Sequence, residues 1–226
     1  MTTVVLVRHG LTAMTGPLLA GWTAGLHLDE RGMKQAAALA ERLAPVTFTA
    51  IVSSPLDRCL DTARAIAGDQ EIRQDERLGE CDYGDWTGKA LKDLAKDPMW
   101  KVVQQQPSAA VFPGGEALRD TQHRAVAAVR DWNAELGPDV TWLACSHGDV
   151  IKAITADALG LHLDQFQRIV IDPCSVTVIR YTDQRPYVIR VNDTGGGVGD
   201  LLPVSKGRRK KASADAQVGG GAGHLG

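Results

Sequence analysis

The hydrophobic pattern along the chain predicts strands and helices in regular alternation. Short apolar runs typical of buried strands occupy 3–7, 50–52 and 140–145, and two more β-rich runs lie near the end, at 175–181 and 187–191. Apolar residues at helical spacing occupy 30–43, 55–67, 89–96, 116–136 and 149–159. This alternation predicts an α/β fold, a three-layer α/β/α sandwich whose mostly parallel sheet carries helices on both faces.

Helix ends are marked by capping residues. Asp29 is the predicted N-cap of the first helix, and Pro45 lies just beyond its end. Ser54 is the predicted N-cap of the second helix, with Pro55 as its first residue and Gly68 after its last turn. These signals mark where the helices after the first two predicted strands begin and end.

The same pattern divides the chain into a folded body and a tail. Residues 1–193 are expected to form one domain, with an irregular insertion at about 81–115 that lies over the sheet and its active site. Residues 194–226 are rich in Gly, then basic, then rich in Gly again, and they contain few large apolar side chains. We therefore predict that this tail is disordered.

Composition narrows the class of protein. The net charge of −2 disfavours a polyanion binder, so no nucleic-acid partner is expected. No run of 18 apolar residues and no signal-peptide pattern is present, which predicts a cytoplasmic protein without a membrane partner. Four scattered cysteines without a C-x-x-C motif favour reduced thiols over a zinc site. We expect neither a metal nor another cofactor.

Chemically active residues follow three of the predicted strands. The first strand ends on Arg8-His9-Gly10, the third on Ser146-His147-Gly148, and the helix after the second carries Arg58. The carboxyl ends of parallel strands share one edge of the sheet, so these side chains are expected to converge. Two guanidinium groups beside two imidazoles favour a tetrahedral anion such as phosphate. Gly148 opens a helix whose N-terminus adds partial positive charge.

An imidazole in such a pocket can also act as a nucleophile. Nearby arginines keep His9 neutral, and a neutral ring nitrogen attacks phosphorus readily. The leaving alkoxide then needs a proton from a carboxylic acid. Glu80 is the candidate for this acid, with Asp82 and Asp85 in the same segment as alternatives.

Five segments in order resemble the histidine phosphatase superfamily, also called the phosphoglycerate mutase-like family. The resemblance covers roughly 1–190, and its segments are Val7-Arg8-His9-Gly10-Leu11-Thr12, Gly21-Trp22-Thr23 with Leu28-Asp29-Glu30-Arg31-Gly32, 53–63, 78–88 around Glu80, and Ser146-His147-Gly148. It implies His9 as nucleophile, Glu80 as proton donor and acceptor, His147 as transition-state stabiliser, Arg8 and Arg58 as phosphate ligands, and no metal.

Other contacts with the substrate are less well defined by the sequence. Thr15 lies near the position where the family often has a phosphate-binding Asn or Ser. Trp22 is a second candidate for contact with the substrate, and packing within the fold is its alternative role. Many phosphatases of the family read Pro-Gly-Gly-Glu-Ser before the long helix, whereas here Ala117 follows Glu116. The apolar insertion residues Trp100, Val111 and Phe112 suggest a modest, partly uncharged leaving group.

Three functions fit these residues, and the sequence favours the first. It is a phosphomonoester hydrolase that acts on a small phosphorylated metabolite. A phosphomutase of the phosphoglycerate mutase type is disfavoured, because only 66 residues separate Glu80 from His147 and they contain no adjacent arginine pair. A non-catalytic phospho-ligand binding module would not need Glu80. The two C-terminal β-runs could pair in a homodimer, and the sequence leaves that question open, as it does the identity of the substrate.

Overall fold

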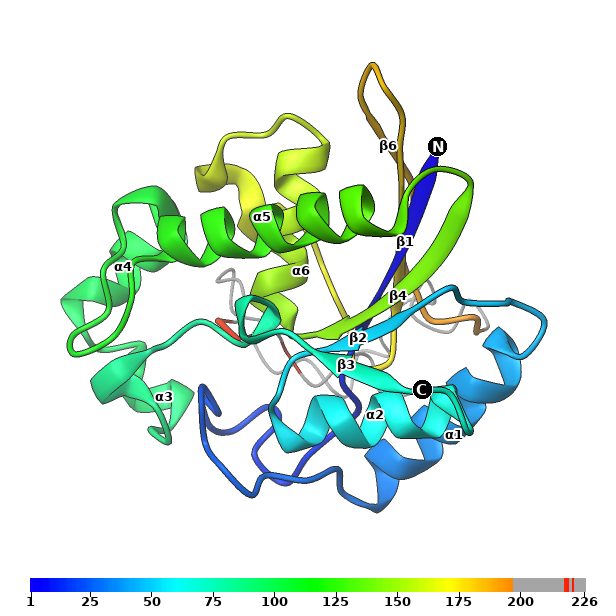
Figure 1. Ribbon diagram of the computed structural model, residues 1–226. Coiled ribbons are helices and arrows are strands. Elements are labelled where there is room, and N and C mark those ends of the chain that lie inside the picture. Colours follow the sequence, from blue (N-terminus) through cyan, green and yellow to red (C-terminus); the bar gives the residue numbers. More distant parts are fainter. Residues whose placement is uncertain (197–217, 220, 222–226) are drawn as a thin grey trace, which may run out of the picture.

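A six-stranded sheet forms the centre of the molecule. The computed structural model describes residues 1–196, 218, 219 and 221 (Figure 1). Within them the strand order is β3-β2-β4-β1-β5-β6. The strands are β1 (Thr2–Arg8), β2 (Ile51–Ser53), β3 (Ile72–Gln74), β4 (Val140–Ser146), β5 (Val176–Tyr181) and β6 (Pro186–Asp193). Strands β1 to β4 pair in parallel, whereas β5 pairs antiparallel with both β1 and β6, so the predicted mostly parallel sheet is confirmed.

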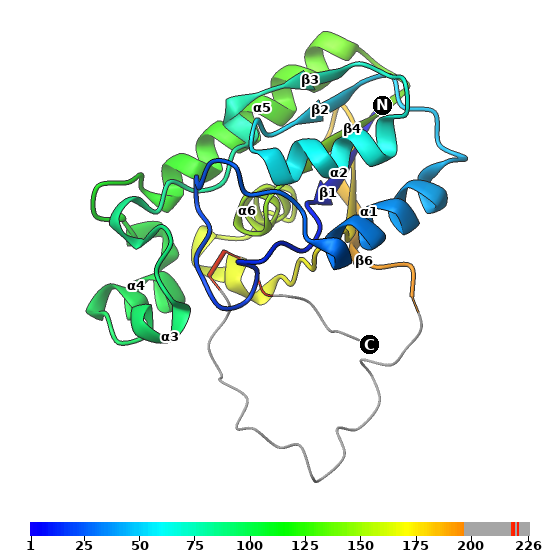
Figure 2. The same ribbon diagram turned by 90° about the horizontal axis from the view of Figure 1, so that it is seen from below.

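Helices cover both faces of this sheet. In Figures 1 and 2, α1 (Glu30–Leu43) and α2 (Asp57–Ala67) lie side by side on one face, and α5 (Leu118–Leu136) and α6 (Gly148–Ala158) lie on the other. The short helices α3 (Leu91–Leu94) and α4 (Pro98–Gln105) lie at one end of the molecule. The three-layer sandwich expected from the alternation is therefore observed.

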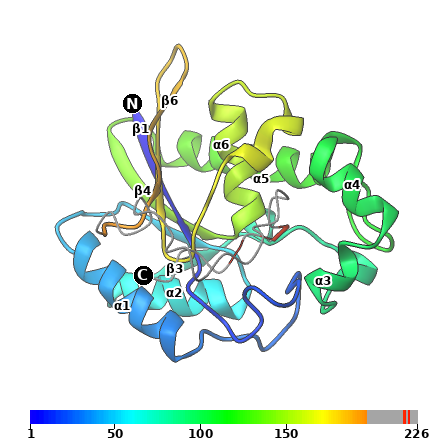
Figure 3. The same cartoon turned by 180° about the vertical axis from the view of Figure 1, so that it is seen from behind.

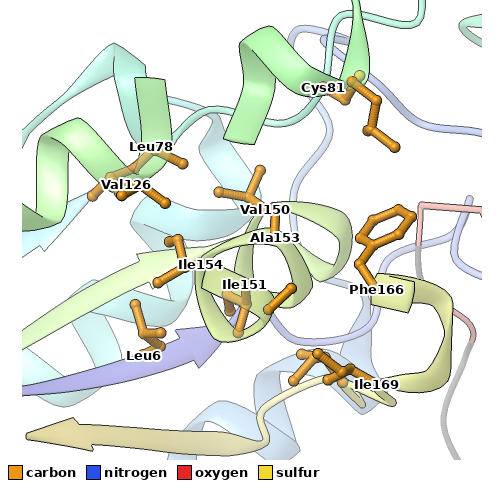
Figure 4. Close-up of a cluster of buried hydrophobic side chains, with 14 of the residues drawn as sticks. Leu6, Leu78, Cys81, Val126, Val150, Ile151, Ala153, Ile154, Phe166 and Ile169 are labelled. Carbon is orange, nitrogen blue, oxygen red and sulfur yellow. The ribbon is translucent and has the colours of Figure 1, made fainter. Parts of the chain in front are cut away.

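Strand β1 shows how the sequence builds both layers. Its residues alternate in direction, as successive side chains of a strand must. Val4 and Leu6 belong to the apolar cluster formed with α5 and α6, whereas Val5 and Val7 belong to the cluster formed with α1 and α2. All four are buried. Figure 4 shows the first cluster, in which Leu6 lies near Ile151 and Ile154 of α6.

The carboxyl ends of three neighbouring strands meet at one edge of the sheet. Arg8 is the register partner of Ser146, and Ser53 is that of Cys145. The residues that follow, His9, Ser54 and His147, therefore leave the sheet at the same level. Gly32 of α1 packs against the turn after His9, since a Cβ on it would lie 2.0 Å from the Leu11 carbonyl oxygen. Close packing of backbone thus fixes the loop that carries His9.

The start of α2 differs from the prediction. Its N-cap is Leu56, and the helix begins at Asp57 rather than at Pro55. Ser54 does not cap the helix, because its hydroxyl contacts the His147 ring and accepts only a long hydrogen bond, 3.3 Å, from the Leu56 amide. The Ser-Pro signal was therefore wrong here because the serine serves a tertiary contact instead of a local one.

The insertion and the tail also depart in detail from the expected elements. The helix expected at 89–96 is only the four residues of α3, while α4 and the short strand β3 were not expected, and α5 begins at Leu118 rather than at 116. The expected disordered tail, 194–226, lies mostly outside the described residues. Within the described part of the chain, no helix is long and apolar enough to cross a membrane.

Candidate active site

A pocket opens where the three strand ends meet the loop after β1. It encloses about 320 Å³, part of it open to solvent. Its walls contain four of the five residues that the sequence singled out as catalytic. Among the described residues the lining is Arg8, His9, Thr15, Gly16, Leu18, Leu19, Ala20, Gly21, Arg58, Glu80, Val218 and Gly219. In Figure 3 the dark blue loop after β1 runs to the insertion, where Leu18 and Ala90 form an isolated β-bridge.

The ring of His9 is held in one orientation. Its Nδ1 lies 2.8 Å from the Gly10 carbonyl oxygen, which can only accept, so Nδ1 carries the hydrogen. The lone pair is then on Nε2, where the Arg58 Nε–H donates at 3.3 Å. Burial, followed by the charges of Arg58 and Arg8, holds the pKa of His9 well below its usual range. His9 is therefore a neutral imidazole at the pocket wall, and its unprotonated Nε2 accepts a hydrogen bond from Arg58.

Arg58 links the two histidines. Its Nη2 donates to the Gly21 carbonyl oxygen at 2.7 Å and lies 3.2 Å from Nδ1 of His147. Its Nη1 is buried and has no hydrogen-bond partner among the described residues. A buried guanidinium donor without an acceptor is costly, and an anion in the pocket would satisfy it. The geometry therefore favours an anionic ligand beside Arg58.

His147 lies behind this pair and is fully buried. Its ring packs edge-on to His9, with centroids 5.3 Å apart, and its Nε2 lies 2.8 Å from the Ser54 hydroxyl oxygen and 3.4 Å from Cys59 Sγ. Burial, then the charge of Arg58, lowers the pKa of His147 well below its usual range. His147 does not itself line the pocket, and it reaches the site through contacts with Arg58 and with Glu80, whose Oε2 is 3.9 Å from Nδ1.

Glu80 is the carboxyl group at the pocket wall. It is only 3 % exposed, and its Oε1 accepts the Cys81 amide at 3.0 Å. Burial raises the pKa of Glu80 to about 7, and the Asp149 carboxylate adds to the rise against the opposing effect of Arg58. Asp82 and Asp85, the alternatives from the sequence, are exposed and do not line the pocket. Of the three acids, Glu80 alone lines the pocket, and its raised pKa suits proton transfer near neutral pH.

Arg8 meets the described residues of the C-terminal tail. Its Nη1 donates to the carbonyl oxygens of Ile171 at 2.8 Å and Gly221 at 2.7 Å, and its Nη2 lies 3.5 Å from that of Gly219. The red segments of Figure 1 mark these tail residues, beside the N-terminal end of α6. Val218 is buried, and Gly219 at φ +75° lies so close to Leu19 that a Cβ would come within 2.8 Å of its Cδ1.

A buried polar cluster beside Arg8 was not anticipated from the sequence. The Asp149 carboxylate accepts hydrogen bonds from the Tyr83 hydroxyl at 2.9 Å, from the Gly219 amide at 2.8 Å and from Lys152 Nζ at 3.1 Å. Asp149 directly follows the Ser146-His147-Gly148 motif at the start of α6. That adjacency was the only feature of the sequence that could have indicated a role for Asp149. The cluster anchors the tail and supplies negative charge near Glu80.

The remaining candidate residues have simpler surroundings. The Thr15 hydroxyl accepts the Thr12 amide at 3.0 Å and contacts the Thr12 hydroxyl at 2.9 Å, although Thr15 does line the pocket. Trp22 does not line it; its Nε1 donates to the Glu80 carbonyl oxygen at 2.6 Å. Gly148 is the buried first residue of α6.

Among the described residues, no group of three or more His, Cys, Asp or Glu side chains could hold a metal ion.

The apolar part of the pocket is not the one predicted. Trp100 and Phe112 are buried in the core, Val111 is exposed, and none of the three lines the pocket. The apolar wall is formed instead by Leu18, Leu19 and Val218. The insertion aromatics do not reach the pocket because they form a local core, in which Trp100 stacks on Trp86 and Phe112 packs edge-on to Trp86.

Comparison with known proteins gives consistent relatives. The chain is 30 % identical over 206 residues to phosphoserine phosphatase 1 of Hydrogenobacter thermophilus, covering 86 % of this chain and 93 % of that one. It is 34 % identical over 174 residues to a glucosyl-3-phosphoglycerate phosphatase of Mycolicibacterium vanbaalenii, covering 72 % and 76 %. Other relatives at similar identity are named as phosphoglycerate mutases.

Solved structures and a family model agree with these relatives. A phosphoserine phosphatase mutant of Entamoeba histolytica, solved in complex with phosphoserine, superposes with a TM-score of 0.79 at 26 % identity over 86 % of this chain and 98 % of that one. The model of the histidine phosphatase superfamily (branch 1) matches residues 4–194. That match takes in all six strands apart from the first two residues of β1, both helical layers, and every pocket-lining residue except Val218 and Gly219. The chain belongs to the histidine phosphatase superfamily.

Proposed function

We propose that this chain hydrolyses small phosphate monoesters through a phosphohistidine formed on His9. The observation that carries the proposal is the state of His9, a neutral ring whose Nδ1–H is fixed by Gly10 and whose Nε2 lone pair lies beside the unsatisfied guanidinium of Arg58. Nucleophile and anion site are thus adjacent, as in-line attack on a phosphoryl group requires.

The first step transfers the phosphoryl group to the enzyme. Nε2 of His9 attacks phosphorus, the ester P–O bond breaks, and the Glu80 carboxyl gives its proton to the departing alkoxide. Arg8 and Arg58 neutralise the phosphoryl oxygens throughout. We assign His147 the role of stabilising the same charge through Arg58: the guanidinium Nη2 can only donate to its Nδ1, 3.2 Å away, and its Nε2–H can donate to the Ser54 hydroxyl.

The second step returns His9 to its starting state. The Glu80 carboxylate takes a proton from water, the water oxygen attacks phosphorus, and the N–P bond breaks to release inorganic phosphate. Glu80 is protonated again at the end, and no metal takes part in either step. Guanidinium groups supply the positive charge that a metal provides in other phosphatases, so we expect activity to persist in EDTA.

The pocket favours hydrolysis of an ester with an uncharged leaving group. Within the described residues, Arg8 and Arg58 are the only cationic side chains that line it. The arginines between the acid and the second histidine are engaged elsewhere: Arg124 with Glu116, Arg130 with Asp157, and Arg119 with Asp120. None of the three is among the described residues that line the pocket, where the mutase alternative requires an arginine for the substrate carboxylate.

A panel of phosphate esters in EDTA tests this proposal. We expect phosphate release from sugar and nucleoside phosphates, with kcat/KM about tenfold or more above that for 3-phosphoglycerate or phosphoserine, since a carboxylate would enter without a partner. Interconversion of phosphoglycerates without phosphate release would favour the mutase. Higher activity on the carboxylate-bearing esters than on every other ester would contradict the proposed substrate class.

Gly219 provides a test of the phosphate site itself. The carbonyl oxygens of Gly219 and Gly221 use Arg8 donors that a phosphate oxygen also needs. We expect Gly219→Val to displace this segment and to strengthen competitive inhibition by inorganic phosphate about tenfold, the value of one charge-assisted hydrogen bond. Gly196→Val, at an open position, is the matched control. Unchanged or weaker inhibition in Gly219→Val would show that the tail does not compete for Arg8.

Two properties remain predictions from the sequence. The four cysteines are free and buried, in keeping with the reducing compartment expected for a cytoplasmic protein. The edge strand β6 carries Tyr187, Ile189 and Val191, all more than 40 % exposed, and this strand is where a homodimer would form.

A further inference from the structure

The segment that carries Glu80 has no regular secondary structure to hold it. Glu80 lies between two single-turn 3-10 helices, η1 (Glu76–Leu78) and η2 (Gly84–Trp86). In a helix or a sheet the backbone carbonyls would be satisfied by the element itself. Here the carbonyl oxygens of Arg77, Gly79 and Glu80 all accept hydrogen bonds from one side chain, that of Arg124 on α5, at 2.8, 2.8 and 2.9 Å.

Arg124 is itself fixed by an ion pair. Its Nε and Nη2 donate to the two carboxylate oxygens of Glu116 at 3.1 and 2.5 Å, a bidentate geometry. Each side chain is about one-fifth exposed, so solvent screens the pair only in part. The Glu116 carboxylate also accepts the Asp82 amide at 2.9 Å. The Arg124–Glu116 pair therefore holds the backbone on both sides of the Glu80 side chain. Arg124 binds the carbonyl oxygens up to that of Glu80, and Glu116 binds the amide of Asp82.

Trp22 makes a third contact with the segment that carries Glu80. Trp22 Nε1 shares the Glu80 carbonyl oxygen with Arg124, and its ring covers Gly79 so closely that a Cβ there would lie 2.4 Å from Cζ2. With its carbonyl held twice and its Oε1 held by the Cys81 amide, Glu80 has little freedom left. None of these holding side chains lines the pocket.

We propose that Arg124, oriented by Glu116, is a positioning residue that holds the Glu80 carboxyl within reach of the leaving-group oxygen. The inference rests on the proposed function, in which Glu80 donates that proton. Arg124 touches neither substrate nor the reacting atoms. Its effect is on the geometry of proton transfer, where a displacement of about 1 Å can cost about 100-fold in rate.

Leaving groups of different basicity separate this role from general support of the fold. An alkoxide leaves only when it is protonated, whereas p-nitrophenolate is a weak base that leaves without help. Misplacing Glu80 should therefore slow hydrolysis of β-glycerol phosphate far more than that of p-nitrophenyl phosphate. Partial unfolding lowers both rates by the same factor, so the ratio of the two kcat/KM values is independent of the folded fraction.

The experiment measures this ratio in the full chain with Arg124→Lys, Glu116→Gln and a control. Lysine keeps the charge but has no planar fork to reach three carbonyls and a carboxylate. We expect the ratio of alkyl to aryl kcat/KM to fall about 10- to 100-fold in Arg124→Lys and by a smaller factor in Glu116→Gln. The matched control is Arg130→Ala, which removes an exposed arginine of the same helix paired with Asp157, and it should leave the ratio unchanged.

The outcomes also distinguish this inference from the function on which it rests. If Glu80→Gln lowers the ratio and Arg124→Lys does not, Glu80 is the acid and the positioning role of Arg124 is wrong. If Glu80→Gln itself leaves the ratio at the wild-type value, proton donation by Glu80 is wrong. If Arg124→Lys lowers both rates equally, Arg124 supports the fold rather than the geometry of Glu80.

Discussion

His9→Ala should lower kcat for every phosphate ester by about 10⁴-fold or more, because among the described residues His9 supplies the only imidazole that lines the pocket. The side chain that replaces it is smaller and neutral, and His9 is neutral in the wild type, so the charge of the site does not change. Arg8 and Arg58 remain, and the variant should still bind inorganic phosphate. The measurement is phosphate release in EDTA, together with phosphate binding by calorimetry.

A matched histidine separates the nucleophile from a general effect of histidine removal. His123 lies exposed on α5, away from the pocket, and His123→Ala should keep wild-type turnover. Undiminished turnover in His9→Ala would rule out the phosphohistidine mechanism. Loss of phosphate binding together with turnover would indicate a ligand role for His9 in place of nucleophilic attack.

Glu80→Gln should lower kcat/KM for alkyl phosphates by about 10² to 10⁴-fold, the usual contribution of general acid catalysis. Glutamine has the same shape, but it can neither donate an acidic proton nor take one from water. The pKa of Glu80, raised by burial to about 7, sets the pH dependence. Below pH 7 the carboxyl is protonated and can donate, so wild-type kcat/KM should fall as the pH rises through 7.

The decisive comparison is the pH profile of kcat/KM for the wild type and the variant. The ionisation of the substrate affects both equally, whereas the decline near pH 7 belongs to Glu80 and should be missing in Glu80→Gln. Asp85→Asn, which alters an exposed acid of the same segment, serves as the control and should retain the wild-type profile. Persistence of the decline in Glu80→Gln would assign it to another group.

Much of the fold and of the site could be predicted because both depend on local signals. The apolar runs that became β1, β2 and β4 are buried on both faces, and such runs indicate parallel strands covered by helices. Their common direction then brings the ends of β1 and β4, with Arg58 on α2, to one edge. The convergence of His9, Arg58 and Glu80 at one pocket follows from that topology together with the motifs.

The features that escaped prediction depend on contacts between distant residues. Strand β3 has three residues, two of them exposed, and only its pairing with β2 makes it a strand. Val218 and Gly219 lie in a Gly-rich stretch without periodicity, yet they meet Leu19 and Asp149. Arg124 looks like any surface arginine on an amphipathic helix until its carbonyl partners are placed next to it.

Trapping the intermediate tests the central claim most directly. The full-length protein is mixed with a ³²P-labelled ester, quenched in base during turnover, digested and mapped by mass spectrometry. Phosphohistidine is stable in base and labile in acid, so the account predicts a base-stable, acid-labile label on the peptide that contains His9, with none in the His9→Ala protein. Label on another residue, or steady turnover with no trapped phosphoprotein at any quench time, would contradict it.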